Sequence, residues 1–129
     1  MIIDAIADIL ELTGIGEVGT DIFIGEIPLD KQGVVSLMHA PSPEPNKSIP
    51  YYTQTIDVWA KFSDYDLGMA KMQSIMDFLH RKENYGLTGF YVYLSYAMGM
   101  IDDFDRDSER NHLFKMSFSF VYRVANELS

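Results

Sequence analysis

Residues 51–81, YYTQTIDVWAKFSDYDLGMAKMQSIMDFLHR, change their periodicity halfway along. Up to Phe62 the apolar side chains recur at every second position, which predicts a strand. From Asp64 onward they recur every three or four positions, which predicts an amphipathic helix. Each element has one apolar face to bury, so the stretch predicts a sheet that is covered by helices.

The predicted strand has two unlike faces, because successive side chains point to opposite sides. The first face is apolar apart from its amide, and its members are Gln54, Ile56, Val58, Ala60 and Phe62. The second face is mixed, and its members are Thr53, Thr55, Asp57, Trp59 and Lys61. Ser63 or Asp64 is the expected N-cap of the helix that follows. The apolar face of the strand is therefore expected to pack on that helix.

The remaining elements lie on both sides of this stretch. Residues 2–12 have helical spacing, and Gly14 and Gly16 follow as a helix end. Residues 21–28 and 33–40 predict two short strands, joined by a hairpin turn at DKQG, 30–33. Between residues 41 and 50 lie four of the five prolines, which predicts a loop.

After the helix, KENYG (82–86) predicts a turn. GFYVYLSYAMGM (89–100) and LFKMSFSFVYRV (113–124) alternate and predict strands, with the charged hairpin connection 101–112 between them. Together the elements predict one domain, residues 1–129, of the α+β class. Its single mixed or mostly antiparallel sheet has about five strands and is packed by two helices.

Composition excludes several classes of protein. The chain is 47% hydrophobic and 22% charged, which is typical of globular proteins, and it has no cysteine for a disulfide, a thiolate or a zinc site. No apolar run approaches the ~20 residues of a membrane span, so no membrane partner is expected. The N-terminal MIIDAIADILEL lacks a basic region and carries acids, so no secretory signal is expected and the protein is expected in a cytoplasm.

The net charge of −9 argues against ordinary nucleic-acid binding, in which Lys and Arg neutralise phosphates. The acidity is compatible with mimicry of DNA, with letting DNA pass without adhering, or with solubility alone.

The sequence contains no recognisable catalytic, metal-binding or dinucleotide-binding motif. Asp103, Asp105 and Asp107 have the spacing of a calcium loop, but Ser108 and Phe114 occupy the positions that need glycine and glutamate. His39, His80 and His112 belong to separate elements, and the glycine-rich TGIGEVG (13–19) follows a helix rather than a strand. We therefore expect no catalytic residue, no metal and no cofactor.

The mixed face of the sheet is the most informative surface. Its composition resembles that of a protein interface, which favours Tyr, Trp and Arg. The candidate subunit-interface residues are Trp59, Tyr91, Tyr93, Lys61 and Arg123. The alternative is that the N-terminal helix covers this face, with Trp59 as an ordinary core anchor.

Two segments together resemble a known family. DVWAKFSDYDLGMAKMQSIMDFLH (57–80) and DRDSERNHLFKMSFSFVYRV (105–124) are similar to the tail terminator and minor capsid proteins of tailed phages. The resemblance covers most of the chain and rests on packing patterns. It implies a structural protein of the virion, assembled in the cytoplasm of a bacterial host.

The resemblance also implies partners. Such proteins form a ring, typically a hexamer, that ends polymerisation of the major tail tube protein and joins it to the head–tail connector proteins. DNA would pass through this ring without specific binding. Asp102, Asp103, Asp105, Asp107 and Glu109 are the candidates for a channel lining or a docking loop. Two other interpretations stay open, namely a connector protein of the same phage neck and an acidic DNA mimic that inhibits a host enzyme.

Overall fold

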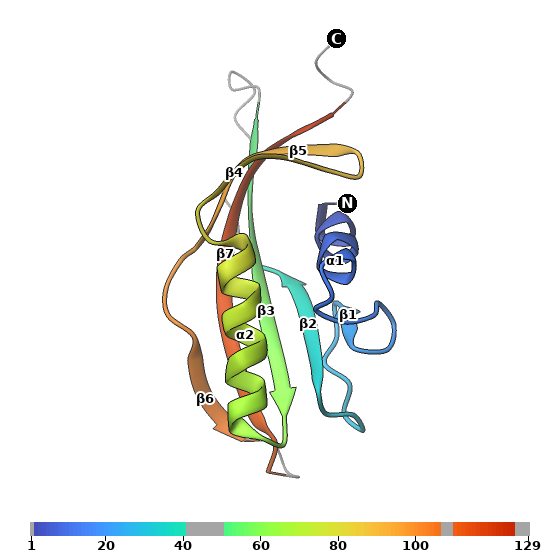
Figure 1. The fold of residues 1–129 in the computed structure, drawn as a ribbon, viewed down its shortest axis with the longest axis vertical. Coiled ribbons are helices and arrows are strands. Elements are labelled where there is room, and N and C mark those ends of the chain that lie inside the picture. Colours follow the sequence, from blue (N-terminus) through green and yellow to red (C-terminus); the bar gives the residue numbers. More distant parts are fainter. Residues whose placement is uncertain (1, 41–50, 107–109, 126–129) are drawn as a thin grey trace.

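The computed structural model describes residues 2–40, 51–106 and 110–125, of which residues 104–106 by their backbone alone. The helices and strands within these residues (Figure 1) are α1 Ile2–Leu12, β1 Ile22–Ile24, β2 Val34–His39, β3 Tyr52–Phe62, α2 Tyr65–Leu79, β4 Lys82–Leu87, β5 Phe90–Ala97, β6 Asp102–Arg106 and β7 His112–Val124. They form the expected α+β fold, but the sheet has seven strands rather than about five. The predicted proline-rich loop, 41–50, lies outside the described residues.

β7 lies at the centre of the sheet. Its pairing with β3 confirms the strands that the sequence predicts up to Phe62 and over residues 113–124. The order of the strands is β1-β2-β3-β7-β5-β4, and β6 also pairs with β7. On one side β7 pairs with β3 along its length, from Tyr122 opposite Tyr52 to His112 opposite Phe62. On the other side it pairs with β5 near its C-terminal end and with β6 near its N-terminal end.

The predicted hairpin between residues 21–28 and 33–40 is wrong. β1 pairs with β2 in parallel, with Ile22 opposite Val35 and Ile24 opposite Leu37. Parallel strands cannot be joined by a tight turn, so residues 25–33 return along the sheet before β2 begins. The Lys61 ammonium donates to the carbonyl oxygens of Pro28 and Leu29, at 3.0 Å each, and so fixes this return loop.

The predicted turn at KENYG is also wrong, because these residues begin β4. The hairpin between β4 and β5 turns instead at Thr88 and Gly89, where Gly89 has a φ of 80°. β4 is held to α2 and β5 by a short chain of hydrogen bonds. The Tyr85 hydroxyl donates to Ser95 Oγ, and Ser95 Oγ donates to the carbonyl oxygen of Leu79, both at 2.7 Å.

Strand β5 contains a β-bulge that sequence alternation does not predict. Its register with β7 shifts between Val92 and Leu94. A bulge adds one residue to one strand, so the faces are exchanged beyond it. Val92 and Ser95 are consequently buried on the same face, whereas regular alternation put Leu94 with Val92.

Both helices have ends that their sequences explain. Gly14, with a φ of 85°, ends α1, since its N–H donates to Glu11 O (3.1 Å) and the N–H of Ile15 donates to Leu10 O (3.0 Å). At the start of α2, Asp64 is the N-cap, and its Oδ1 accepts from the N–H of Leu67 (3.1 Å).

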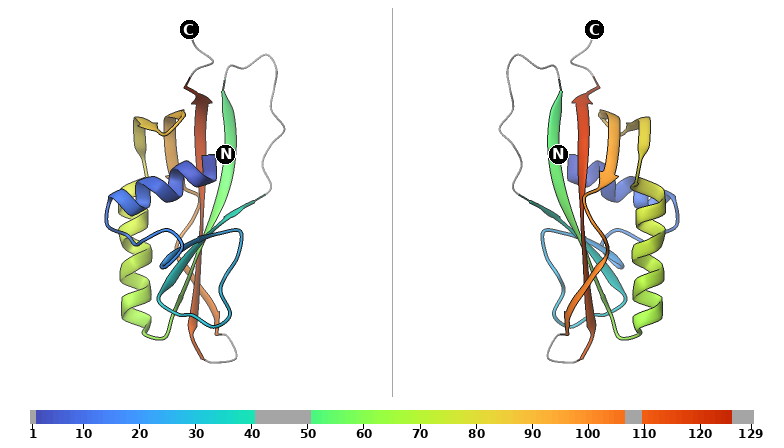
Figure 2. Two further views of the ribbon diagram at one scale, coloured as in Figure 1. Left: turned by 90° about the vertical axis from the view of Figure 1, so that its right-hand side faces the viewer. Right: turned by 90° about the vertical axis from the view of Figure 1, so that its left-hand side faces the viewer.

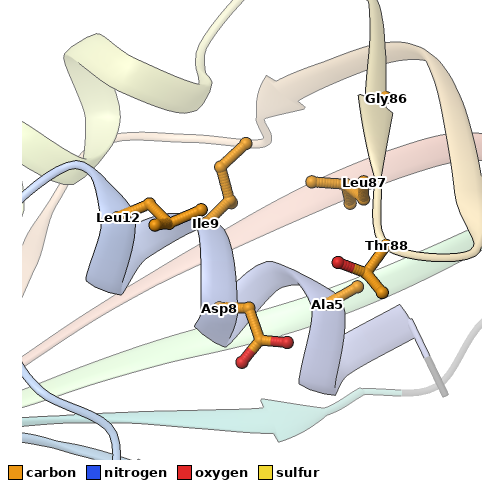
Figure 3. Close-up of a pocket in the computed structure, with 7 residues that line it drawn as sticks. All are labelled: Ala5, Asp8, Ile9, Leu12, Gly86, Leu87 and Thr88. Atoms are coloured by element: carbon orange, nitrogen blue, oxygen red, sulfur yellow. The ribbon is translucent and has the colours of Figure 1, made fainter.

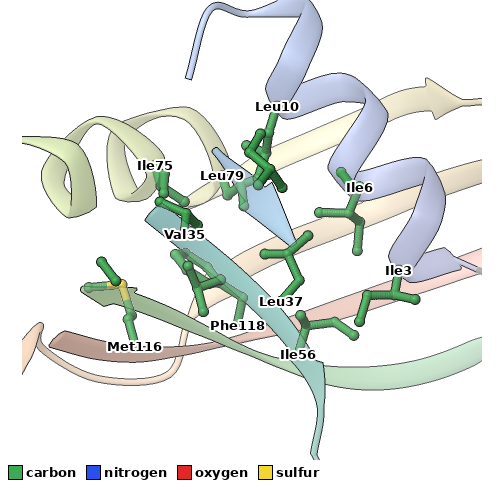
Figure 4. Close-up of a cluster of buried hydrophobic side chains, with 14 of the residues drawn as sticks. Ile3, Ile6, Leu10, Val35, Leu37, Ile56, Ile75, Leu79, Met116 and Phe118 are labelled. Atoms are coloured by element: carbon green, nitrogen blue, oxygen red, sulfur yellow. The ribbon is translucent and has the colours of Figure 1, made fainter. Parts of the chain in front are cut away.

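Both helices lie on one side of the sheet (Figure 2), and the hydrophobic core is between them and the strands (Figure 4). The aromatic side chains of β7 at the centre of this core are fully buried, and they are Phe114, Phe118 and Phe120. Aliphatic residues of α1, α2, β2 and β3 surround them, among them Leu10, Ile75, Leu37, Ile56 and Val58. We call the opposite side of the sheet, which neither helix covers, the outer face.

Candidate assembly surfaces

Four of the five predicted interface residues lie on the outer face, at two separate places along β7. Trp59 lies opposite Lys115, and Tyr91 lies opposite Arg123, at positions that alternate with the buried core residues. The alternative, in which α1 covers this face, does not hold, because α1 packs on the core side. Trp59 is half-buried there rather than a core anchor.

Near the middle of the outer face, Trp59 belongs to a small cluster with charges. The Lys115 Nζ atom lies 5.4 Å from the centre of the Trp59 ring and 3.7 Å from Asp57 Oδ2. Asp57 Oδ1 accepts a hydrogen bond from Ser117 Oγ. The ammonium is therefore held between an aromatic ring and a carboxylate, an arrangement that stabilises by about 0.5–1 kcal/mol at exposed sites.

A second cluster, which we call the tyrosine group, consists of Tyr51, Tyr91, Tyr93 and Arg123. The Arg123 guanidinium lies 4.7 Å from the centre of the Tyr91 ring. Tyr93 meets Tyr91 edge-on at 5.4 Å and Tyr51 edge-on at 6.5 Å between ring centres. Aromatic rings with a polar tip and a stacked guanidinium are the residues on which binding energy concentrates in protein interfaces.

Lys61, the fifth predicted interface residue, shares the outer face but not its surface. Only 3% of it is exposed, because its ammonium donates to the carbonyl oxygens of Pro28 and Leu29. Its role in this structure is to anchor the loop between β1 and β2. The candidate interface therefore consists of Trp59, Tyr91, Tyr93 and Arg123.

The predicted acidic hairpin connection is partly a strand, since Asp102–Arg106 forms β6 and pairs with β7. Asp102 lines a shallow groove of about 310 Å³ together with Lys115 and the exposed Met98 and Met100. Asp103 Oδ2 lies 4.0 Å from His112 Nδ1.

The other predicted acids of this connection are described less fully. Asp105 is described by its backbone alone, opposite Leu113, and Asp107 and Glu109 lie outside the described residues. That these five acids line a channel or form a docking loop stays a prediction.

A groove on the helix side of the sheet was not predicted from the sequence. It lies between α1 and the β4–β5 turn (Figure 3) and has a volume of about 330 Å³. Its lining consists of Ala5, Asp8, Ile9, Leu12, Gly86, Leu87 and Thr88. The sequence did not predict this groove because KENYG reads as a turn, whereas these residues begin β4, which lines the groove. Tyr85 and Leu87 alternate before the Thr88–Gly89 pair, which was the signal for a β-hairpin.

The three histidines belong to separate elements of the structure. His39, His80 and His112 lie at the end of β2, at the end of α2 and at the start of β7, and His80 Nδ1 accepts from the N–H of Ala97 at 3.0 Å. No three His, Asp or Glu side chains among the described residues converge as metal ligands.

Two tyrosines have perturbed acidities. Burial raises the pKa of Tyr85 to about 12, and the hydrogen bond to Ser95 partly opposes this rise. Burial, together with the neighbouring Tyr52, also raises the pKa of Tyr122. Both effects stabilise the neutral phenols in a packed environment rather than preparing them for proton transfer.

No helix in the described part of the chain has the length and apolar character that crossing a bilayer requires.

Comparison with known proteins identifies a family and a similar fold. A family model described as "Bacteriophage tail terminator protein" matches residues 9–124. A chain in a solved structure described as the virion of a native gene transfer agent (GTA) particle is similar in fold, with a TM-score of 0.53 and 14% identity over 81% of this chain and 79% of that chain. None of the curated proteins matches this chain.

Proposed function

This chain belongs to the bacteriophage tail terminator family, and we propose that it forms a ring, a hexamer, at the head-proximal end of a phage tail tube. There it ends polymerisation of the tube and provides the surface to which the head is joined. As a member of this family the chain is a structural component of the phage tail and of the virion. We propose no catalytic role for it, because the family is a structural one.

The observation that carries the proposal is the outer face, which neither helix covers. A closed ring needs two different and complementary surfaces on every subunit. The outer face supplies one of them, with Trp59, Tyr91, Tyr93 and Arg123 exposed in part on a rigid sheet. The composition of this surface favours binding to another protein over contact with solvent alone.

The ring is proposed to contact the major tail tube protein on one side and head–tail connector proteins on the other. DNA is proposed to pass through without specific binding, in accordance with the net charge of −9. The hairpin Asp102–Arg110 has five acids and two arginines, so its copies would repel the phosphates of duplex DNA, which carries a charge about every 1.7 Å along its axis.

Light scattering after size exclusion, followed by electron microscopy of any large species, tests the ring. The proposal requires a closed ring whose hole admits duplex DNA, about 20 Å across. If the protein is monomeric alone, it is mixed with tube protein that is polymerising. Capped tubes of limited length would then support the proposal, and tubes of unchanged length would contradict it.

The same mixture separates the alternatives. A ring that ignores the tube but binds the portal complex would reassign the protein to the phage neck as a connector. A monomer that neither closes into a ring nor caps tubes, but inhibits a DNA-binding enzyme, would indicate a DNA mimic.

A further inference from the structure

We propose that the groove between α1 and the β4–β5 turn of one subunit binds the Arg123–Tyr91 pair of the next subunit. The inference rests on the proposed ring and names its second surface. The outer face is the donor of this contact, and the groove on the helix side is the acceptor.

The groove has the chemistry of a site for a cation on an apolar or aromatic stem. Its lining is partly polar and partly aliphatic, with Ile9 and Leu12 on α1 and Leu87 at the end of β4 (Figure 3). Leu12 is 85% exposed and adds apolar surface that a neighbouring subunit could cover. The volume of about 330 Å³ is at the lower limit for ligand pockets and suits one or two side chains.

A single carboxylate, Asp8, lies in this lining. Among the described residues no side chain pairs with the Asp8 carboxylate. The sequence around α1 is acidic as well, because residues 1–30 contain seven acids and no Lys or Arg. The groove therefore offers a cation one exposed carboxylate that has no side-chain partner among the described residues.

Arg123 is better placed for this contact than the two lysines of the outer face, Lys61 and Lys115. Lys61 is buried against the carbonyl oxygens of the return loop, and Lys115 is held by Asp57. Arg123 instead lies flat on Tyr91 at 4.7 Å and donates to the carbonyl oxygen of Ala125 at 3.3 Å. The guanidinium has five N–H donors, so it retains enough of them for a bidentate contact with a carboxylate.

The register places the two surfaces back to back at one end of the sheet. Gly86 of the groove lies opposite Tyr91, and Tyr91 lies opposite Arg123. The groove opens on the helix side, whereas Arg123 and Tyr91 lie on the outer face. One subunit cannot satisfy its own groove through its sheet, so the contact is heterologous and propagates from copy to copy, and it closes into a ring where the rotation between subunits allows.

Two charge reversals, Asp8→Lys and Arg123→Glu, test the contact. Each variant alone brings like charges together at every interface, and like charges in contact oppose association. We expect each alone to lose ring or tube-capping activity by about tenfold or more.

A one-to-one mixture of the two variants should regain this activity. In an alternating ring, the new carboxylate of the Arg123→Glu subunit would meet the new ammonium of the Asp8→Lys subunit. At the next interface, the unaltered Arg123 would meet the unaltered Asp8. A ring of six allows this alternation to close.

The controls are Asp77→Lys on the exposed side of α2 and Lys31→Glu on the return loop, which make the same charge changes outside both surfaces. Neither should affect assembly. Restored assembly in the mixture also shows that each variant is folded.

Two results would overturn the inference. In the first, the variants assemble alone as well as the wild type. In the second, both keep the thermal unfolding curve of the wild type but their mixture stays inactive. Failure of the wild type itself to close a ring or cap a tube would count instead against the proposed function.

Discussion

Gly68 of α2 lies against the ring of Phe114 in β7, so closely that a Cβ added at Gly68 would stand 3.0 Å from the Phe114 Cζ atom and nearer still to Cε2. The absence of a side chain at Gly68 thus determines how close the helix lies to the central strand. Glycine in a helix interior costs about 1 kcal/mol relative to alanine, and here the close approach offsets that cost.

Gly68→Ala should destabilise the protein in spite of its better helix propensity. Overpacking costs about 1–3 kcal/mol, and contacts as short as these place the effect at the upper end, for a net loss of about 2 kcal/mol. Urea unfolding measures it. Gly86→Ala is the matched control, because a Cβ there meets nothing within 4 Å. Addition of Phe114→Leu should recover part of the loss, and an additive double variant would contradict the packing explanation.

Lys61→Met should loosen the return loop between β1 and β2. The substitution keeps the aliphatic stem but leaves two carbonyl oxygens, those of Pro28 and Leu29, without the ammonium donor. Loss of such a partner costs about 1–3 kcal/mol. Hydrogen exchange should show faster exchange in residues 25–33, and Lys31→Met, on the exposed part of the same loop, should not reproduce it. Unchanged exchange in Lys61→Met would contradict the anchoring role.

Stability should fall as the pH rises from about 10 to about 12. The pKa of Tyr85 is raised from 10.0 to about 12, so above pH 10 the unfolded chain releases a proton that the folded chain retains. At about 1.4 kcal/mol per pH unit the full loss approaches 3 kcal/mol, and solvent screening at this half-buried side chain reduces it to about 1–2 kcal/mol. The free energy of unfolding, measured across this pH range, should fall less steeply with pH in Tyr85→Phe than in the wild type. Equal slopes for the two proteins would refute the assignment.

Assembly should change the environment of Trp59. It is the one tryptophan of the chain and is half-buried on the outer face, so its fluorescence reports on that surface. We expect its emission to move to shorter wavelength and its quenching by acrylamide to decrease when rings form. Dilution below the assembly threshold is the internal control. An emission spectrum that is identical in rings and in monomers would place the interface elsewhere.

Neutralising the hairpin should affect the passage of DNA more than assembly. With Asp103, Asp105 and Asp107 changed to Asn, the ring would keep its interface but lose repulsion toward phosphates. Infectivity should fall while tube capping persists. Neutral replacements at the exposed Asp66, Asp77 and Glu83 are the control for total charge. Normal infectivity with normal assembly would exclude the channel role.

The central strands were predictable because they satisfy a local rule over a long stretch. Along β3 and β7 every second residue is apolar, and a shift of one position would expose the whole set, so register and face follow from the pattern. The helix ends were predictable for the same reason, since Asp64 and Gly14 satisfy backbone groups close to them in sequence.

The rest of the sheet depends on information that is not local. The loop that lets β1 run parallel to β2 is anchored by the buried Lys61, which comes long after it in the chain. The bulge near Tyr93 has no signature in composition, and β6 is a strand of mostly charged residues that pairs because β7 offers it a free edge. The acceptor groove was not predicted because the residues that begin β4, which lines it, have the composition of a turn. Its proposed occupant, Arg123, was predicted as an interface residue because interfaces favour Tyr, Trp and Arg.

The place of β7 in the sheet has a consequence for how the subunit is made. β7 comes last of the described strands, yet it joins β3 to β5 and carries β6. On a ribosome, β3 and α2 would emerge without the strand that completes their core, and long-range pairing of this kind cannot begin before the partner is synthesised. A nascent chain therefore holds no finished outer face, and the proposed contact between subunits cannot form before translation has passed Val124.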